Sequence, residues 1–325
     1  MNRNITEILS VLAEYSRAMS SKEIADELRM RGIHLEPRTV RYHLKKLEEI
    51  GLIRKTRDGK REITQKGLEE LRRRSAFERL GEFSERIEFN VYSCTFDLYK
   101  MEGTVPTNVA IIDKDYFEDA VNVLTEVYNS EFSKYLVSKL LIIVDEDEYL
   151  GGIRIPNNAF GIYVISNTVY DVIMRSIGVS MIPEFAGLLH YEKHPKGFTE
   201  LISYSGTTLS PGWLLIRSGL TSVYRCVKNG KGEMITAIRS FSRHAIEIVR
   251  DELEIAKSRG FGGIIGVSYP SSRSFSLPPG NRARLIVSAG LNYLAPFHEL
   301  GLNPELRINE AFVDFKDFKP IEKIL

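Results

Sequence analysis

The sequence predicts a protein of class α+β, in which an N-terminal winged helix-turn-helix is followed by a mixed α/β domain. Within the first 75 residues, three short helix patterns precede a basic hairpin pattern. Further along, apolar strand-like runs alternate with helix patterns. The charge also divides the chain, because residues 1–75 carry 18 Lys+Arg against 12 Asp+Glu and the remainder carries 26 against 31. A polyanion would therefore bind at the N-terminal end.

The length of 325 residues suits two or three domains. With 43% hydrophobic and 27% charged residues, the chain can bury a sizeable core. We expect a winged-helix DNA-binding domain over residues 1–75, a connecting helix over 76–88 and a second domain over 89–325.

The first helix is predicted by Ile5, Ile8, Leu9 and Leu12, which recur at helical spacing. A capping-box pair, Ser20 and Glu23, starts the second helix, which ends near Gly32. Pro37 suits the first turn of the third helix, which ends at Gly51. Two strands, 52–56 and 61–64, follow with a polar turn between them and form the predicted wing.

The third helix has the side chains of a recognition helix, since guanidinium groups bind guanine edges and phosphates. The predicted DNA contacts are Arg38, Thr39, Arg41, Tyr42, Lys45 and Lys46 on this helix, with Arg57, Lys60 and Arg61 on the wing. Alternatively, these charges only solvate a helix face, or the winged helix binds protein. The ordered series of helices and hairpin favours a double-stranded DNA operator as the partner.

Two segments, Ser21–Leu28 and Arg38–Ile53, resemble the winged-helix family of bacterial and archaeal regulators. Residues 65–87 are predicted to form one helix, with Leu68, Leu71 and Phe83 on a common face and a break or kink at Gly81. This helix either pairs two copies of the chain or serves as a packed linker. The basic run 72–74 either touches phosphate or is a solvated helix end.

In the remainder of the chain, strands are expected at 109–113, 140–144, 263–267 and 284–288, and helices at 114–129, 171–177 and 242–258. A hairpin is expected from strands 222–227 and 233–238 around the turn 229–232. The loop between the last two strands contains Pro278, Pro279 and Gly280.

No catalytic, cofactor or metal motif is found. The sequence has neither a dinucleotide fingerprint nor a phosphate-binding loop. His190 and His194 are four apart, but on a predicted strand and turn that spacing does not place both on one face. Cys94 and Cys226 are isolated. We therefore predict no enzyme, no cofactor and no metal site, although an enzyme fused to a DNA-binding domain remains a lesser alternative.

No apolar run approaches the roughly 18 residues that span a bilayer, so a cytoplasmic protein without a membrane partner is expected. One segment, Tyr204–Pro211, suggests a ligand, since a strand end turns through glycine into hydroxyl side chains and a helix start. Hydroxyls and free helix N–H groups suit a small anion. The alternative is a capped helix start in a tight turn.

Three runs, 198–211, 216–223 and 230–239, resemble the regulatory domain of the NrpR family of archaeal nitrogen-regulatory repressors, and the resemblance extends over residues 91–302. It implies a homodimer or tetramer that represses nitrogen-assimilation genes and releases its operator when 2-oxoglutarate binds. This chain departs from the family pattern at Ser210, at Arg239-Ser240 and at 164–168. The candidate effector-binding residues are Ser166, Tyr204, Gly206, Thr207, Thr208, Arg217 and Arg239. The competing interpretation is a regulator whose second domain only oligomerises or binds a protein partner.

Overall fold

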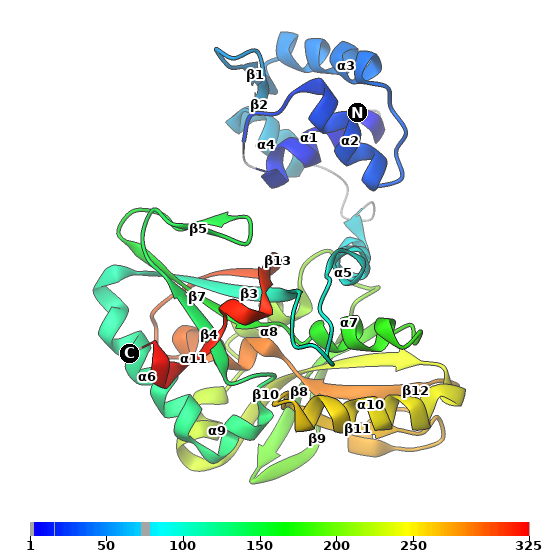
Figure 1. The fold of residues 1–325 in the computed structure, drawn as a ribbon, viewed down its shortest axis with the longest axis vertical. Coiled ribbons are helices and arrows are strands. Elements are labelled where there is room, and N and C mark those ends of the chain that lie inside the picture. The colour runs from blue at the N-terminus through cyan, green and yellow to red at the C-terminus, as the bar shows by residue number, and fades with distance from the viewer. Residues whose placement is uncertain (1–2, 16, 73–78, 325) are drawn as a thin grey trace. The chain divides into compact units, whose positions relative to one another are not determined.

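The computed structural model describes residues 3–15, 17–72 and 79–324, and the chain forms two compact units, Met1–Arg79 and Leu80–Leu325 (Figure 1). Both helices and strands are present in each unit, which confirms the predicted mixed class.

The first unit has the element order of a winged helix. Helices α1 (Arg3–Tyr15), α2 (Ser21–Met30) and α3 (Pro37–Glu49) precede the strands β1 (Ile53–Lys55) and β2 (Arg61–Ile63) and helix α4 (Gln65–Arg72). Met19 adds a backbone bridge to Arg61 beside the hairpin. The core is formed by side chains at helical spacing, including Ile8, Leu12, Ile24, Leu28, Val40, Leu44 and Leu47.

The ends of these helices follow from local sequence. The predicted capping box is confirmed, because the backbone N–H of Ser20 donates to Glu23 Oε2 at 2.7 Å and that of Glu23 donates to Ser20 Oγ at 3.2 Å. Pro37 occupies the first turn of α3, as predicted. Gly32 and Gly51, with φ of 74° and 76°, follow the ends of α2 and α3. Glycine takes this left-handed conformation at helix ends without a steric penalty.

The predicted break at Gly81 is confirmed, and residues 65–87 therefore do not form one continuous helix. Helix α4 ends at Arg72, and a separate helix, α5 (Glu82–Ser93), begins after Gly81, whose φ is 79°. The left-handed glycine ends any continuous helix here. Helix α5 belongs to the second unit, where Phe83 and Ile87 join the core. Residues 73–78, which include most of the basic run, lie outside the described residues.

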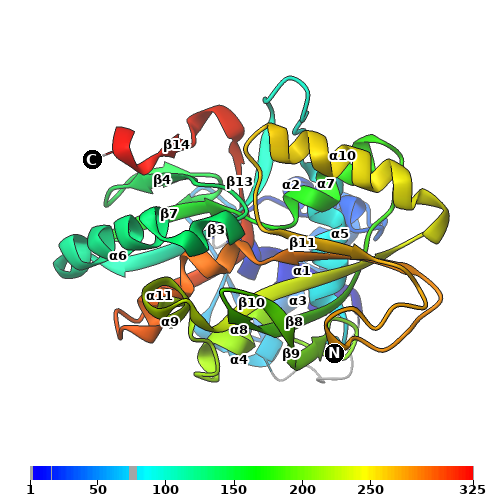
Figure 2. The same cartoon turned by 90° about the horizontal axis from the view of Figure 1, so that it is seen from below.

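The second unit contains two five-stranded antiparallel sheets (Figures 1 and 2). The first has the order β13-β3-β7-β4-β14 and the second has the order β11-β12-β10-β8-β9. The strands of the first sheet are β3 (Thr104–Asp113), β4 (Leu140–Val144), β7 (Ala159–Ile165), β13 (Glu305–Asp314) and β14 (Lys319–Pro320). Those of the second are β8 (Ile182–Glu192), β9 (His194–Ser203), β10 (Lys231–Phe241), β11 (Ile264–Ser268) and β12 (Ala283–Ser288). A separate hairpin pairs β5 (Tyr149–Leu150) with β6 (Ile153–Arg154).

The two sheets share a chain order. Strand β3 leads through a 3₁₀ turn, η2 (Lys114–Tyr116), into the 13-residue helix α6 (Phe117–Asn129). Strand β10 leads through η4 (Arg243–Ala245) into the 13-residue helix α10 (Ile246–Ser258). In each half the two strands that follow the helix enter the sheet in reverse order. Strands β4 and β7 give the order β3-β7-β4, and strands β11 and β12 give the order β10-β12-β11. The second unit is thus built from two halves of one plan.

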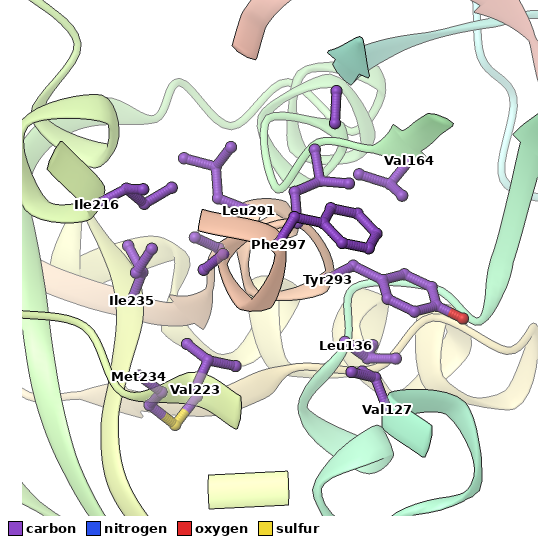
Figure 3. Packing of buried hydrophobic residues seen from close by; sticks show 14 of the residues in the cluster. Val127, Leu136, Val164, Ile216, Val223, Met234, Ile235, Leu291, Tyr293 and Phe297 are labelled. Carbon is purple, nitrogen blue, oxygen red and sulfur yellow. The ribbon is translucent and has the colours of Figure 1, made fainter. Parts of the chain in front are cut away.

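The remaining helices pack against these sheets. They are α7 (Val169–Ser176), α8 (Pro211–Arg217), α9 (Val223–Asn229) and α11 (Ala295–Glu299), with 3₁₀ segments η3 (Glu131–Tyr135), η5 (Ser274–Ser276), η6 (Gly290–Tyr293), η7 (Phe315–Asp317) and η8 (Ile321–Lys323). Leu291, Tyr293 and Phe297, from η6 and α11, share one core cluster with Val164 of β7 and Ile235 of β10 (Figure 3). The η6–α11 segment therefore joins the two sheets through apolar contacts.

The predicted hairpin around residues 229–232 is wrong in its first half. The segment expected to be a strand forms helix α9, and only β10 is extended. The carboxylate of Glu299 accepts the backbone N–H groups of Val223 and Tyr224, each at 2.8 Å, and so caps the start of the helix. Gly230 ends it with a φ of 67°. This distant cap outweighs the strand preference of the local residues.

Candidate functional site

The first candidate site is the exposed face of α3. One side of this helix packs in the core through the buried side chains of Val40, Leu44 and Leu47. The predicted contact residues all lie on the exposed side: Arg38, Thr39, Arg41, Tyr42, Lys45 and Lys46. The spacing of the helix therefore places them on a single surface.

This surface is positively charged. Within the described part of the chain, Arg38, Arg41 and Lys45 form no ion pair with a carboxylate. Lys46 Nζ lies 4.5 Å from the centre of the Tyr42 ring, and the Tyr42 side chain is 57% exposed. Exposed cations without carboxylate partners can bind phosphate oxygens. The surface thus has the chemistry that a nucleic-acid backbone requires.

The three predicted contact residues of the wing differ in their exposure and in their bonding partners. Arg57 is exposed and Lys60 is half-buried at the turn of the hairpin. Arg61 Nη1 donates to the carbonyl of Gly59 at 2.6 Å, and its Nη2 lies 3.4 Å from Glu48 Oε2 on α3. Arg61 therefore attaches the wing to α3, a role that its position in a basic hairpin did not indicate.

The second candidate site is a small pocket between the two sheets of the second unit. Three side chains of one face of β10, Ile235, Ala237 and Arg239, form one wall because alternate strand residues point the same way. The rest of the lining comes from α5, β3, the end of β7, β8, the segment after β9, α8, η6 and β13. The free space among these side chains is about that of one or two water molecules.

Arg239 dominates the chemistry of this pocket. Its side chain is 1% exposed, and its Nε donates to both carboxylate oxygens of Asp171 on α7, at 2.9 and 3.1 Å. Its guanidinium carbon also lies 5.2 Å from the centre of the Tyr204 ring. Nη1 and Nη2 are buried without a hydrogen-bond partner among the described residues. Two N–H-bearing nitrogens are therefore available to an anion in the pocket.

Burial and charge act in opposite directions on the ion pair. Burial raises the pKa of Asp171, and the neighbouring Arg239 opposes this. Burial alone would lower the pKa of Arg239, but Asp171 and Tyr204 outweigh it and raise that pKa. A guanidinium stays protonated in proteins. The pocket thus keeps a fixed guanidinium that is paired with Asp171 through Nε.

Two asparagines add further unpartnered atoms. Asn108 on β3 and Asn309 on β13 are 1% and 6% exposed, and both line the pocket. Asn108 Nδ2 and Asn309 Oδ1 are buried without a partner in the described chain. Leaving such groups unpaired costs about 1 to 3 kcal/mol each. A ligand that paired them would recover this free energy.

The structure brings some of the predicted effector residues together and separates others. Ser166, Tyr204 and Arg239 line the pocket. Gly206, Thr207, Thr208 and Arg217 are absent from its lining. Thr207 Oγ1 bonds instead to the backbone of Leu209, and Arg217 lies 5.6 Å from the ring of Trp213. The Tyr204–Pro211 segment reaches the pocket only through Tyr204 and Ser210, and Ser210 Oγ caps α8 by accepting the Trp213 N–H.

Sequence reasoning missed Asn108, Asp171 and Asn309. A signal existed for Asn108, since a lone amide stands in the apolar strand Val105–Ile112. Asn309 gave none, because its position depends on an irregularity in strand pairing. His190 Nδ1 lies 2.7 Å from Glu233 Oε1, and among the described residues no group of three or more His, Cys, Asp or Glu is arranged to hold a metal ion.

Two protein-family models match the chain. The model of the NrpR regulatory domains NRD1 and 2 matches residues 80–320, and that of the ribonuclease R winged-helix domain matches residues 6–71. In the part of the chain that the structure describes, no helix meets the length and hydropathy that a bilayer crossing demands.

The chain is similar to proteins named global nitrogen regulator. It is 28% identical to NrpRI of Methanosarcina mazei over 99% of this chain and 98% of that protein. It is 27% identical to NrpR of Methanococcus maripaludis over 99% of this chain, but spans only 56% of that protein. A crystal structure of a nitrogen repressor-like protein from Methanococcus jannaschii has the same fold, with a TM-score of 0.60 and 22% identity over 73% of this chain and 97% of that chain.

Proposed function

This chain belongs to the family of proteins with NrpR regulatory domains, and we propose that it is a DNA-binding transcriptional regulator of nitrogen genes. It acts as a repressor that a small anionic metabolite releases from DNA. The first candidate for this metabolite is 2-oxoglutarate. The observation that carries the proposal is the buried Arg239, whose Nη1 and Nη2 lack partners in the pocket.

The DNA-binding half of the proposal is supported by α3. Arg38, Arg41 and Lys45 are exposed on one face, beside Tyr42 and Lys46. An exposed basic helix of a winged helix fits the major groove, and the basic turn of the wing fits the adjacent backbone. We propose that two or four copies of the chain bind together, because a repeated half-site requires a repeated protein.

The effector half is supported by the chemistry of the pocket. A carboxylate can accept two hydrogen bonds from one guanidinium in a bidentate pair. Asp171 occupies Nε of Arg239, so the opposite edge of the guanidinium remains for the ligand. Ser166 and Asn167 add polar groups around it.

The test uses the full chain and a duplex selected from a random library by binding to it. Gel-shift affinity is measured with and without 2-oxoglutarate, and calorimetry follows the binding of 2-oxoglutarate to the free protein. Binding of 2-oxoglutarate together with weakened operator binding supports the proposal. If neither 2-oxoglutarate nor any of a panel of other keto acids binds, the second unit oligomerises or binds a protein partner instead, and analytical ultracentrifugation then identifies the assembly.

A further inference from the structure

Positive charge gathers at one corner of the second unit, although this part of the chain is acidic as a whole. Residues 76–325 carry 26 Lys+Arg against 31 Asp+Glu, whereas residues 223–231 contain three cations and no carboxylate. The exposed cations of this corner come from α9, the start of β10 and the β8–β9 hairpin, and they are Lys193, Lys196, Arg225, Lys228 and Lys231. These five residues are called the basic corner.

Backbone contacts bring the three segments of the basic corner together. The backbone N–H of Lys193 donates to the carbonyl of Gly230 at 2.8 Å, which joins the β8–β9 turn to the end of α9. Lys231 follows Gly230 and lies opposite Glu192 in the pairing of β10 with β8. The hydrogen bond and charge of Lys231, with a smaller effect from Lys196, lower the pKa of Glu192. Both lysines therefore lie at this turn.

Most of the positive charge of the basic corner is uncompensated. Lys228 and Lys231 are each paired with a glutamate, at 3.0 and 3.2 Å. Lys193, Lys196 and Arg225 have no carboxylate within ion-pair distance among the residues that the structure describes. Three exposed cations are thus available to an anionic partner.

The basic corner lacks the apolar centre of a protein interface. Protein interfaces bury aromatic and other apolar side chains at their core and are depleted in lysine. Within residues 190–200 and 223–231, both of which the structure describes in full, no large hydrophobic side chain is exposed. Exposed lysine and arginine side chains instead match phosphate oxygens, which are bound without regard to base sequence. The composition therefore favours a nucleic-acid backbone over a protein surface.

We propose that the basic corner binds the phosphate backbone of the DNA that the winged helix holds. The inference rests on the proposed function, because DNA bound by the first unit has a high effective concentration for a second contact made by the same chain. The basic corner adds affinity for any sequence, while α3 reads the operator. The acidic second unit thus contributes a DNA contact of its own.

The first experiment measures the salt dependence of operator binding by the full chain. Gel shifts use the selected operator extended by random sequence on both sides. The triple variant Lys193→Gln, Lys196→Gln and Arg225→Gln removes three charges and keeps long side chains. Since each neutralised phosphate contributes about 0.9 to the slope of log K against log salt, the triple variant should lower the slope by about two to three. Its affinity at low salt should fall by about tenfold or more.

The matched control is the triple variant Arg259→Gln, Lys319→Gln and Lys323→Gln. These two lysines and one arginine are also exposed in the second unit, outside the basic corner. Both triple variants change the net charge equally, so only the position of the charges differs, and the control should keep the wild-type slope. Equal slopes in the two triple variants overturn the inference. Where circular dichroism shows the first triple variant unfolded, Lys196→Gln and Arg225→Gln should each lower the slope by about one.

The second experiment locates the contact by crosslinking. Cys94 and Cys226 are both buried, so a thiol-linked aryl azide can be directed to an exposed site. Irradiation of the labelled variant Lys196→Cys should crosslink it to the extended duplex, and the labelled variant Lys319→Cys should give no crosslink. If Lys196→Cys binds the operator but does not crosslink to it, the DNA contact of the basic corner is excluded.

An acidic protein segment is the competing occupant, and poly-L-glutamate serves as its probe. Fluorescence anisotropy follows its binding to the full chain. Binding that the first triple variant abolishes, combined with an unchanged DNA salt slope, overturns the inference in favour of an acidic protein partner. If no duplex of the library binds wild type, the proposed function itself fails. If Arg41→Ala weakens operator binding and the first triple variant does not, only the inference fails.

Discussion

Arg239 and Asp171 form an ion pair with both side chains at most 4% exposed, in which one Nε serves two carboxylate oxygens. Arg239 also lines the pocket, and its Nη1 and Nη2 are buried without a partner among the described residues. A buried pair of this kind is costly to break, because one charge then remains without compensation.

Arg239→Met should therefore lower the free energy of unfolding by about 3 to 5 kcal/mol, because Asp171 would be buried as an unpaired carboxylate. The double variant Arg239→Met with Asp171→Leu removes both charges and should regain most of this loss. Urea unfolding of the full chain, followed by circular dichroism, measures both. Equal losses in the single and double variants would show that packing, rather than charge, determines the cost.

Arg41→Ala and Lys45→Ala should each weaken operator binding by roughly 1 to 3 kcal/mol when the residue reads a base, or lower the salt slope by about one when it binds phosphate. Gel shifts at several salt concentrations distinguish these cases. Lys257→Ala, on the exposed side of α10 in the second unit, is the matched control and should change neither quantity. Unaltered binding in both α3 variants would exclude α3 as the reading helix.

Arg61→Met should lower the stability of the wing more than it lowers the affinity for DNA. The substitution removes the bond to Gly59 and the contact with Glu48 that attach the wing to α3. Hydrogen bonds from charged groups contribute about 1.5 to 3 kcal/mol, so faster amide exchange is expected in β1 and β2. A normal exchange rate combined with a reduced salt slope would instead support the predicted phosphate contact.

Gly290→Ala should destabilise the second unit by roughly 1 to 3 kcal/mol through overpacking. A Cβ at Gly290 would lie 2.4 Å from the carbonyl oxygen of Ile165, which as backbone cannot move aside freely. Gly266→Ala is the control, because nothing lies within 4 Å of its added Cβ. Thermal unfolding midpoints of the two variants should differ clearly, and similar midpoints would contradict the close approach of η6 to β7.

The capping box predicts a pH dependence in the first unit. Bonds from Arg17 and Ser20 lower the pKa of Glu23 from 4.5 to about 2. A carboxyl with a lowered folded pKa stabilises the fold above its unfolded pKa, and this contribution is lost as the pH falls. Amide exchange in α2 should therefore accelerate between about pH 4.5 and pH 2. Glu23→Gln should flatten that change, and an equally steep change in the variant would disprove the role of this carboxylate.

The sequence allowed most of the first unit to be predicted because its signals are local. The Ser20–Glu23 pair and Pro37 mark helix starts through contacts within one turn. The attachment of Arg61 to Glu48 was not predicted, since it is a contact across 13 positions that no local pattern reveals.

The pocket was harder to predict because it is assembled from distant segments. Asp171 and Arg239 are 68 positions apart, and Asn90 and Asn309 are 219 apart. The Tyr204–Pro211 turn was correctly identified as a strand end and helix start, but its hydroxyls are mostly used within the turn. Only Ser166, Tyr204 and Arg239 of the seven candidates reach the pocket.

The two halves share one plan but contribute different side chains to the pocket. Asp113 and Ser242 each precede the 3₁₀ turn of their half. Three positions before them are Ala110 of β3 and Arg239 of β10. Five positions before them are Asn108 of β3 and Ala237 of β10. The halves repeat the order of their strands, but the guanidinium lies on one half and the amide on the other. The two sides of the pocket therefore differ in chemistry although their backbones follow the same plan.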